Sequence, residues 1–233
     1  MAVGKAFLSS VSAGIAFASE VFFFHLQHSG RFLPVGSGVA AGGVVWGLYF
    51  CLKVSRKSLR VVGLLLSALA GLGLCTFQGC GLWAALTALL VTMGYPRLFR
   101  RHALLKPLAI AGAWMAAVAA LTPALPPLLA LQQATLVAAT SLPFDISTYH
   151  EDAFLSFPRR FGLRTTRYVL YALLAVYGLV GWAAYPPLRA ATFATGSVFL
   201  VLMHWPGSLR WPGVLLYDGL FPLQALTAAC LLG

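Results

Sequence analysis

Long apolar runs, separated by short polar or Pro- and Gly-containing joints, make up almost the whole of this 233-residue chain. A helix that crosses a bilayer needs roughly 17–25 largely apolar residues. Nine runs of about this length can be marked, at about 6–27, 33–53, 60–78, 79–95, 104–122, 125–144, 167–185, 188–205 and 211–231. The pattern therefore predicts an all-α, polytopic membrane protein with nine transmembrane helices and a single integral-membrane domain over residues 1–233.

Composition supports this prediction and changes how the charge is interpreted. The chain is 60% hydrophobic and only 9% charged, whereas about a quarter of the residues of a soluble domain are charged. The net charge of +11 would suggest a nucleic-acid partner in a soluble protein. In a membrane protein the basic residues must first be assigned to the two sides of the bilayer, and we expect no nucleic-acid partner.

The positions of lysine and arginine predict the orientation. Short loops rich in these residues stay on the cytoplasmic side. Alternate joints of the nine-span pattern hold fourteen of the sixteen, while the other side receives Arg31 and Arg189. We therefore expect a protein of the cytoplasmic (inner) membrane with its amino terminus inside and its carboxyl terminus outside. The fourteen are Lys5, Lys53, Arg56, Lys57, Arg60, Arg97, Arg100, Arg101, Lys106, Arg159, Arg160, Arg164, Arg167 and Arg210.

Three of the five acidic residues lie together in the cytoplasmic joint after the sixth predicted span: Asp145, Glu151 and Asp152. If the sixth helix continues past Pro143, Asp145 and Asp152 are two turns apart and share one face. Two carboxylates on one face suit Mg²⁺, which takes one or two protein carboxylates and completes its shell with water and substrate phosphate. In the alternative interpretation, these acids are solvated and pair with nearby arginines such as Arg159, Arg160 or Arg164.

The same stretch, LPFDISTYHEDAFLSFPRRFG (142–162), resembles the UbiA superfamily of membrane prenyltransferases. The second aspartate-rich motif of that family runs D-x-x-D-x-x-x-D at the end of the sixth helix. Here the motif reads Asp145, Thr148 and Asp152, followed by Ser156, Pro158 and Gly162. Residues 104–123, 142–146 and 217–226 resemble a UbiA-like branch found in Bacteroidetes-type bacteria.

The resemblance implies a bundle of nine helices around a cytoplasm-facing cavity and an enzyme that moves an isoprenyl group from an isoprenyl diphosphate to an apolar acceptor. It implies that Asp145 and Asp152 are catalytic and hold Mg²⁺, which with cationic side chains neutralises the leaving diphosphate. The cations that would steady the diphosphate are Lys53, Arg56, Arg159 and Arg160.

The first aspartate-rich motif of the family is absent. Its place at the end of the second span reads GLYFCLKVSRKSL (47–59), which contains no carboxylate. Lys53, Arg56 and Lys57 could replace one metal by contacting phosphate directly. The alternative is a non-catalytic homologue that binds a lipid or a partner protein in the membrane, and a transporter is a more distant third class.

Further polar residues lie in or beside the spans. Asp218 lies about two turns into the last predicted helix. An intramembrane carboxylate is unfavourable in contact with lipid, so we expect Asp218 to face a cavity together with Tyr49 and Gln224. In the alternative interpretation, Asp218 joins a polar network with Tyr217 or a neighbouring helix. Small residues at 36–47 favour close helix packing. The basic clusters favour contact with anionic lipid, and Trp205 and Trp211 are typical of interfacial anchors.

Overall fold

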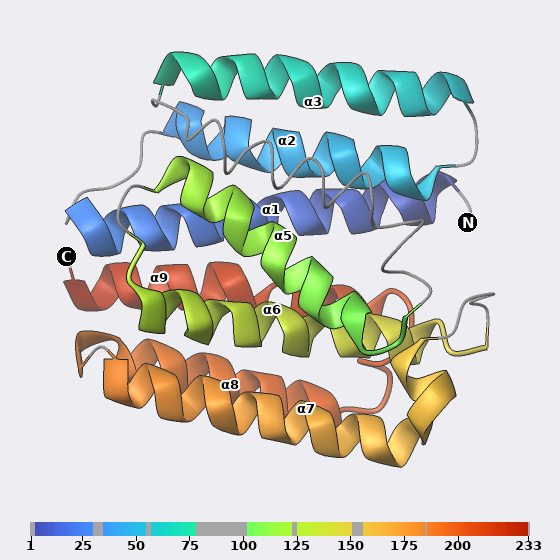
Figure 1. The fold of residues 1–233 in the computed structure, drawn as a ribbon, viewed down its shortest axis with the longest axis vertical. Helices are drawn as coiled ribbons and strands as arrows, with labels where there is room; N and C mark the ends of the chain where they lie inside the picture. The colour runs from blue at the N-terminus through green and yellow to red at the C-terminus, as the bar shows by residue number, and fades with distance from the viewer. Residues whose placement is uncertain are drawn as a thin grey trace. The chain divides into compact units, whose positions relative to one another are not determined.

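The computed structural model describes residues 3–29, 35–54, 57–77, 102–122, 125–150, 156–184 and 186–232. The regular structure of these residues is entirely helical (Figure 1), so the predicted all-α class is confirmed for this part of the chain. The helices are α1 (Val3–Ser29), α2 (Val35–Lys53), α3 (Lys57–Phe77), α5 (Leu105–Leu121), α6 (Pro127–Ser147), α7 (Phe157–Ala184), α8 (Arg189–His204) and α9 (Leu220–Leu232), with 3-10 turns η2 (Pro186–Leu188) and η3 (Gly213–Tyr217).

Seven predicted spans each coincide with one of these helices, while the span at 79–95 lies outside the described residues. The last predicted span, at 211–231, is divided: η3 and a turn at residues 218–219 precede α9, which begins only at Leu220. Among the described residues, four stretches are long and apolar enough to cross a membrane: Val3–Gln27, Val35–Lys53, Phe157–Ala183 and Gly213–Leu231. A shorter apolar stretch covers Leu105–Ala119 in α5. By length and composition these helices indicate a membrane protein, while a count of nine crossings stays a prediction.

The chain divides into two compact units. The first contains Met1–Cys80 and Asp218–Gly233, and so includes α1, α2, α3 and α9. The second contains Gly81–Tyr217, and so includes α5 to α8 with both 3-10 turns. The expectation of one integral-membrane domain over residues 1–233 stays a prediction.

Glycines set the helix spacing in the first unit, where α2 packs between α1 and α3, and α9 packs on α1 (Figure 1). A Cβ built on Gly14 of α1 would lie 2.8 Å from the carbonyl oxygen of Gly42 in α2, and one built on Gly47 would lie 2.5 Å from that of Gly63 in α3. Such close backbone approach is typical of small-residue helix packing in membranes. The interpretation of the glycine-rich stretch as a packing surface therefore agrees with the structure.

In the second unit, α6 packs against α5 and α7, and α7 packs against α8 (Figure 1). A buried hydrogen bond of 2.8 Å joins Gln132 Nε2 of α6 to Thr192 Oγ1 of α8. Gly181 of α7 leaves room for this bond, because a Cβ there would lie 2.1 Å from the Gln132 amide nitrogen. Helix α6 begins with Pro127 in its first turn, where a missing N–H costs nothing, and continues through Pro143.

Helix α7 begins at Phe157, ten residues before the predicted seventh span. The sequence predicts a loop at these positions. This prediction is wrong for Arg159 and Arg160, which lie on the first turns of α7. The backbone of Gly162 is non-helical, with φ 85° and ψ 158°, and separates a short first segment from the long one that follows. Positive φ is readily available to glycine because it has no Cβ. The last glycine of the resembling motif is therefore the residue at which this helix changes direction.

Candidate functional site

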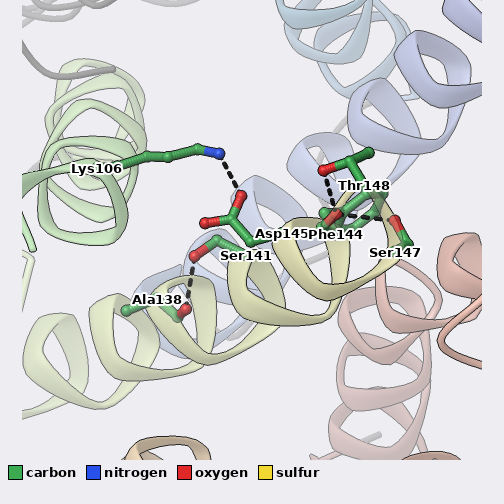
Figure 2. A network of polar contacts seen from close by, with 7 residues as sticks. All are labelled: Lys106, Ala138, Ser141, Phe144, Asp145, Ser147 and Thr148. Carbon is green, nitrogen blue, oxygen red and sulfur yellow. Dashed lines mark hydrogen bonds and ion pairs between the residues drawn. The ribbon is translucent and has the colours of Figure 1, made fainter. Parts of the chain in front are cut away.

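A buried ion pair joins the first turn of α5 to the last turns of α6. The Nζ atom of Lys106 donates to Oδ1 of Asp145 (Figure 2). The Asp145 side chain is 4% exposed and that of Lys106 is 13% exposed, so water screens the pair weakly. A charge withdrawn this far from water is costly unless it is paired and hydrogen-bonded. The ion pair explains how a carboxylate can be buried on this apolar helix.

Hydroxyl groups next to Asp145 bond back to their own helix. Ser141 Oγ donates to the carbonyl oxygen of Ala138 at 2.7 Å, and Ser147 Oγ and Thr148 Oγ1 donate to that of Phe144 at 2.8 and 3.0 Å (Figure 2). Thr148 stands where the resembling motif has its middle aspartate. Its hydroxyl caps the end of α6, so a structural role accounts for this departure from the motif.

The end of α6 limits the argument for two carboxylates on one helical face. The helix passes Pro143, as the argument required, but it ends at Ser147, and Thr148–His150 form a turn. Regular helical spacing from Asp145 therefore stops five residues before Asp152, which lies outside the described residues together with Glu151. Within the described ranges, no group of three or more His, Cys, Asp or Glu side chains could hold a metal ion.

The fit to Mg²⁺ can be tested on Asp145 alone. This residue supplies one carboxylate, which is the oxygen ligand that Mg²⁺ prefers, and one or two such groups are enough when a substrate phosphate completes the shell. The paired Lys106 ammonium repels a bare cation but attracts the phosphate that would accompany it. One paired carboxylate falls short of the ligand set of a free cation, so Mg²⁺ at Asp145 would need oxygen ligands from outside the described residues.

Arg159 lies close to the end of α6. Its Nε donates at 2.9 Å to the carbonyl oxygen of Tyr149, two residues after the helix ends. A cation is favourable there because the carbonyl groups at a helix carboxyl end carry partial negative charge. The guanidinium of Arg160 lies 5.6 Å from the ring centroid of Phe161, and both arginines are exposed. The cation paired with Asp145 is thus Lys106, and Arg159 instead contacts the backbone of Tyr149, just after the end of α6.

A second polar cluster lies in the first unit, around Lys53 at the end of α2. Lys53 Nζ donates to Ser9 Oγ of α1 at 3.1 Å and lies 4.2 Å from the centroid of the Tyr49 ring. Ser9 Oγ in turn donates to the carbonyl oxygen of Ala6 at 3.1 Å, so this hydroxyl both accepts and donates. The lysine that the resemblance assigned to diphosphate therefore has partners within its own unit.

Asp218 belongs to the same cluster. The Ser12 hydroxyl of α1 and the charge of Lys53 both favour the charged form of its carboxylate. We had expected Asp218 to lie two turns inside the last helix, which was wrong, because it lies in the turn that precedes α9. A carboxylate is favoured at that position by the partial positive charge of the helix amino end. Gln224 is buried on α9, and Arg56 lies outside the described residues.

The sequence pattern missed Lys106 and the two serines. The sequence assigns Lys106 to the cytoplasmic side only. The alternation of spans also indicates that Lys106 and Asp145 lie near each other. The start of the fifth span and the end of the sixth lie on one side of the bilayer, and consecutive spans joined by a short loop are commonly neighbours. Ser9 and Ser12 carried no comparable signal, because isolated serines are common in membrane helices that pack closely.

Comparison of the chain with protein-family models, with curated proteins and with solved structures found no match. The functional argument therefore rests on the residues and their geometry.

Proposed function

We propose that the protein is a UbiA-like membrane prenyltransferase that binds an isoprenyl diphosphate at the Lys106–Asp145 pair. The observation that carries the proposal is this buried pair. Four residues after Asp145, the carbonyl oxygen of Tyr149 accepts a hydrogen bond from Arg159 and so keeps a second cation close in the chain. A buried ionisable residue in a membrane protein is a functional-site hypothesis by default. Lysine and arginine together can bind the oxygens of a diphosphate, lysine as a point charge and arginine through its planar fork.

In the proposed reaction, the allylic carbon–oxygen bond to the diphosphate breaks and the same carbon bonds to the apolar acceptor. The acceptor loses a proton, so the products are the prenylated acceptor, pyrophosphate and H⁺. Lys106, Arg159 and Arg160 would stabilise the negative charge that gathers on the leaving diphosphate. Asp145 and Asp152 would hold Mg²⁺, which adds further neutralisation of that charge.

The membrane arrangement forms part of the proposal. It consists of nine crossings in the inner membrane with the amino terminus inside, and a cavity that opens to the cytoplasm. The division of lysine and arginine between alternate joints supports it. Reporter fusions after residues 155 and 187 should report opposite sides of the membrane. A result that places both on one side would exclude this topology.

The second candidate is a non-catalytic homologue that binds a lipid or a partner protein. One observation favours it. Tyr49 and Lys53, which stand where the resembling family has its first aspartate-rich motif, take part in a cluster with Ser9 in their own unit. Without that motif the site holds fewer carboxylates for metal. Binding without transfer is the behaviour expected if the remaining site lacks the power to ionise the donor.

Binding and turnover of farnesyl and geranylgeranyl diphosphate by purified protein, with and without Mg²⁺, separate the candidates. In protein that purifies as folded, we expect Asp145→Asn and Asp152→Asn to remove the Mg²⁺-dependent part of binding, whereas Glu151→Gln, a matched acidic control from the same stretch, keeps it. Arg160→Gln should weaken binding even without metal, and Arg189→Gln should not.

Release of pyrophosphate in the presence of an acceptor supports the enzyme. Binding with no release, over a range of apolar acceptors, supports the non-catalytic homologue. Equal binding with and without Mg²⁺ would show that the metal assignment of Asp145 and Asp152 is wrong. No binding of either diphosphate would exclude the proposed site.

A further inference from the structure

A basic and aromatic surface covers the first half of the long segment of α7 and the end of α8. We define it by Arg164, Arg167, Tyr168, Tyr171, His204 and Trp205, and call it the α7–α8 surface. All six side chains are exposed, and all belong to the second unit. Arg164, Tyr168 and Tyr171 follow one another at the i, i+4, i+7 spacing of a single helical face, and Arg167 lies one turn before Tyr171.

The side chains of this surface are ordered by contacts with one another. Arg164 Nε donates to the Tyr168 hydroxyl at 3.2 Å, and its guanidinium lies 5.7 Å from the centroid of that ring. The Tyr171 hydroxyl lies 3.2 Å from Nε2 of His204, and Nδ1 of His204 lies 2.8 Å from the carbonyl oxygen of Leu200. A carbonyl oxygen only accepts, so Nδ1 donates, and Nε2 of the neutral ring accepts from Tyr171. This bond joins α7 to α8 at the surface.

An apolar groove lies beside the polar groups. Leu200, Val201, His204 and Trp205 line a shallow, open groove at the end of α8. Val201 is 66% exposed and Trp205 is 56% exposed. The Tyr171–His204 contact connects this groove to the helical face that holds the exposed arginines. Exposed apolar side chains and arginines on one surface suit a ligand with an anionic head and an apolar tail. Free phosphate would use the arginines and leave the groove unexplained.

The position of the surface also points to a lipid. It lies within and beside Phe157–Ala183, one of the stretches long and apolar enough to cross the membrane. Arginine, tyrosine and tryptophan at the end of a spanning helix lie at the level of lipid headgroups. Arginines there are attracted to anionic headgroups. We propose that the α7–α8 surface binds an anionic phospholipid, with the phosphate at Arg164 and Arg167 and an acyl chain in the groove by Trp205.

The opposite end of the same helix pair offers a matched control. Arg189 at the start of α8 also pairs with an aromatic residue of α7: its Nε donates to the carbonyl oxygen of Trp182 at 2.9 Å, and its guanidinium lies 4.6 Å from the centroid of that ring. Arg189→Gln removes the same charge as Arg164→Gln but leaves the α7–α8 surface intact. A general effect of net charge would act on both variants alike.

The test is titration of detergent-solubilised protein with phosphatidylglycerol, followed by native mass spectrometry. Phosphatidylcholine with the same acyl chains and free glycerol 3-phosphate serve as comparison ligands. We expect phosphatidylglycerol to bind in preference to both. Arg164→Gln and Arg167→Gln should each raise its apparent Kd about fivefold, the effect of one basic residue near an anionic headgroup, and Arg189→Gln should leave it within about twofold of the wild type. Trp205→Ala should weaken binding of the lipid without changing that of glycerol 3-phosphate.

Several outcomes would overturn the proposal. Equal binding of phosphatidylcholine would remove the role of charge, and equal binding of glycerol 3-phosphate would indicate a soluble phosphate ligand. An equal effect of Arg164→Gln and Arg189→Gln would indicate non-specific attraction. If a variant does not purify as folded protein, the comparison of the three ligands on the wild-type protein decides the outcome by itself.

Discussion

Lys106 and Asp145 form a buried ion pair between two consecutive helices, α5 and α6. The two residues are 39 positions apart in the chain. Each charge is largely removed from water, and each neutralises the other. The pair therefore has a consequence for the stability of the second unit that can be measured separately from the binding of any ligand.

The first prediction concerns the stability of this pair. Lys106→Met or Asp145→Asn alone should lower the free energy of unfolding by about 3–5 kcal/mol, because each leaves an uncompensated charge in a buried position. The double variant should cost less than the sum of the two. Thermal unfolding in detergent, followed for all four proteins, gives the coupling. Additive effects would show that the two side chains do not interact.

The second prediction concerns close helix packing in the first unit. Gly63→Ala in α3 should destabilise by about 1–3 kcal/mol, as overpacking does, because the new Cβ would lie 2.8 Å from the carbonyl oxygen of Gly47. Gly71→Ala on the same helix is the control, since its Cβ would meet a side-chain atom of Val44 at an ordinary 3.9 Å. The Tm of the two variants in one detergent checks the difference. Similar Tm values would contradict the close approach of α2 and α3.

The third prediction concerns the bend in α7. Gly162→Ala should cost about 1–2 kcal/mol, because a Cβ is disfavoured in the left-handed region of φ. No steric contact contributes, since nothing lies within 4 Å of the new Cβ. Gly178→Ala lies in the regular part of the same helix with equally open space, and we expect it to be neutral or stabilising. Chemical denaturation gives the free energy of unfolding of both variants. If Gly178→Ala lowers it as much as Gly162→Ala does, the bend at Gly162 is contradicted.

The fourth prediction concerns the polar cluster of the first unit. Lys53→Gln should lower the Tm, because it removes both the hydrogen bond to Ser9 and the charge that acts on Asp218. Lys57→Gln, which neutralises an exposed lysine four residues later, should leave the Tm unchanged. Single hydrogen bonds to charged groups contribute about 1.5–3 kcal/mol. Equal Tm values for the two variants would show that the contacts of Lys53 with the cluster do not stabilise the protein.

Much of the helical framework follows from the sequence, because an apolar run of some twenty residues has few alternatives in a membrane. The backbone must satisfy its hydrogen bonds internally, and a helix does so within one segment. The described helices accordingly coincide with seven of the nine predicted spans, and the last span is divided between η3 and α9. The boundaries that were missed involve polar residues. Helix α7 begins at Phe157 because Pro158 is well suited to the first turn of a helix. Hydropathy alone does not indicate this start, because the first turns of α7 include Arg159 and Arg160.

The partners of the charged residues needed the tertiary structure. Composition identified Asp145 and Asp218 as unusual, since carboxylates are rare in this chain, but their cations could not be read from spacing. Asp145 has Lys106 on another helix, and Asp218 has Ser12 and Lys53 from α1 and α2. An ion pair depends on a distance of a few ångströms between side chains, and hydrophobic periodicity determines only which residues share a face. Which helices become neighbours, and at what height along their axes, is decided by packing.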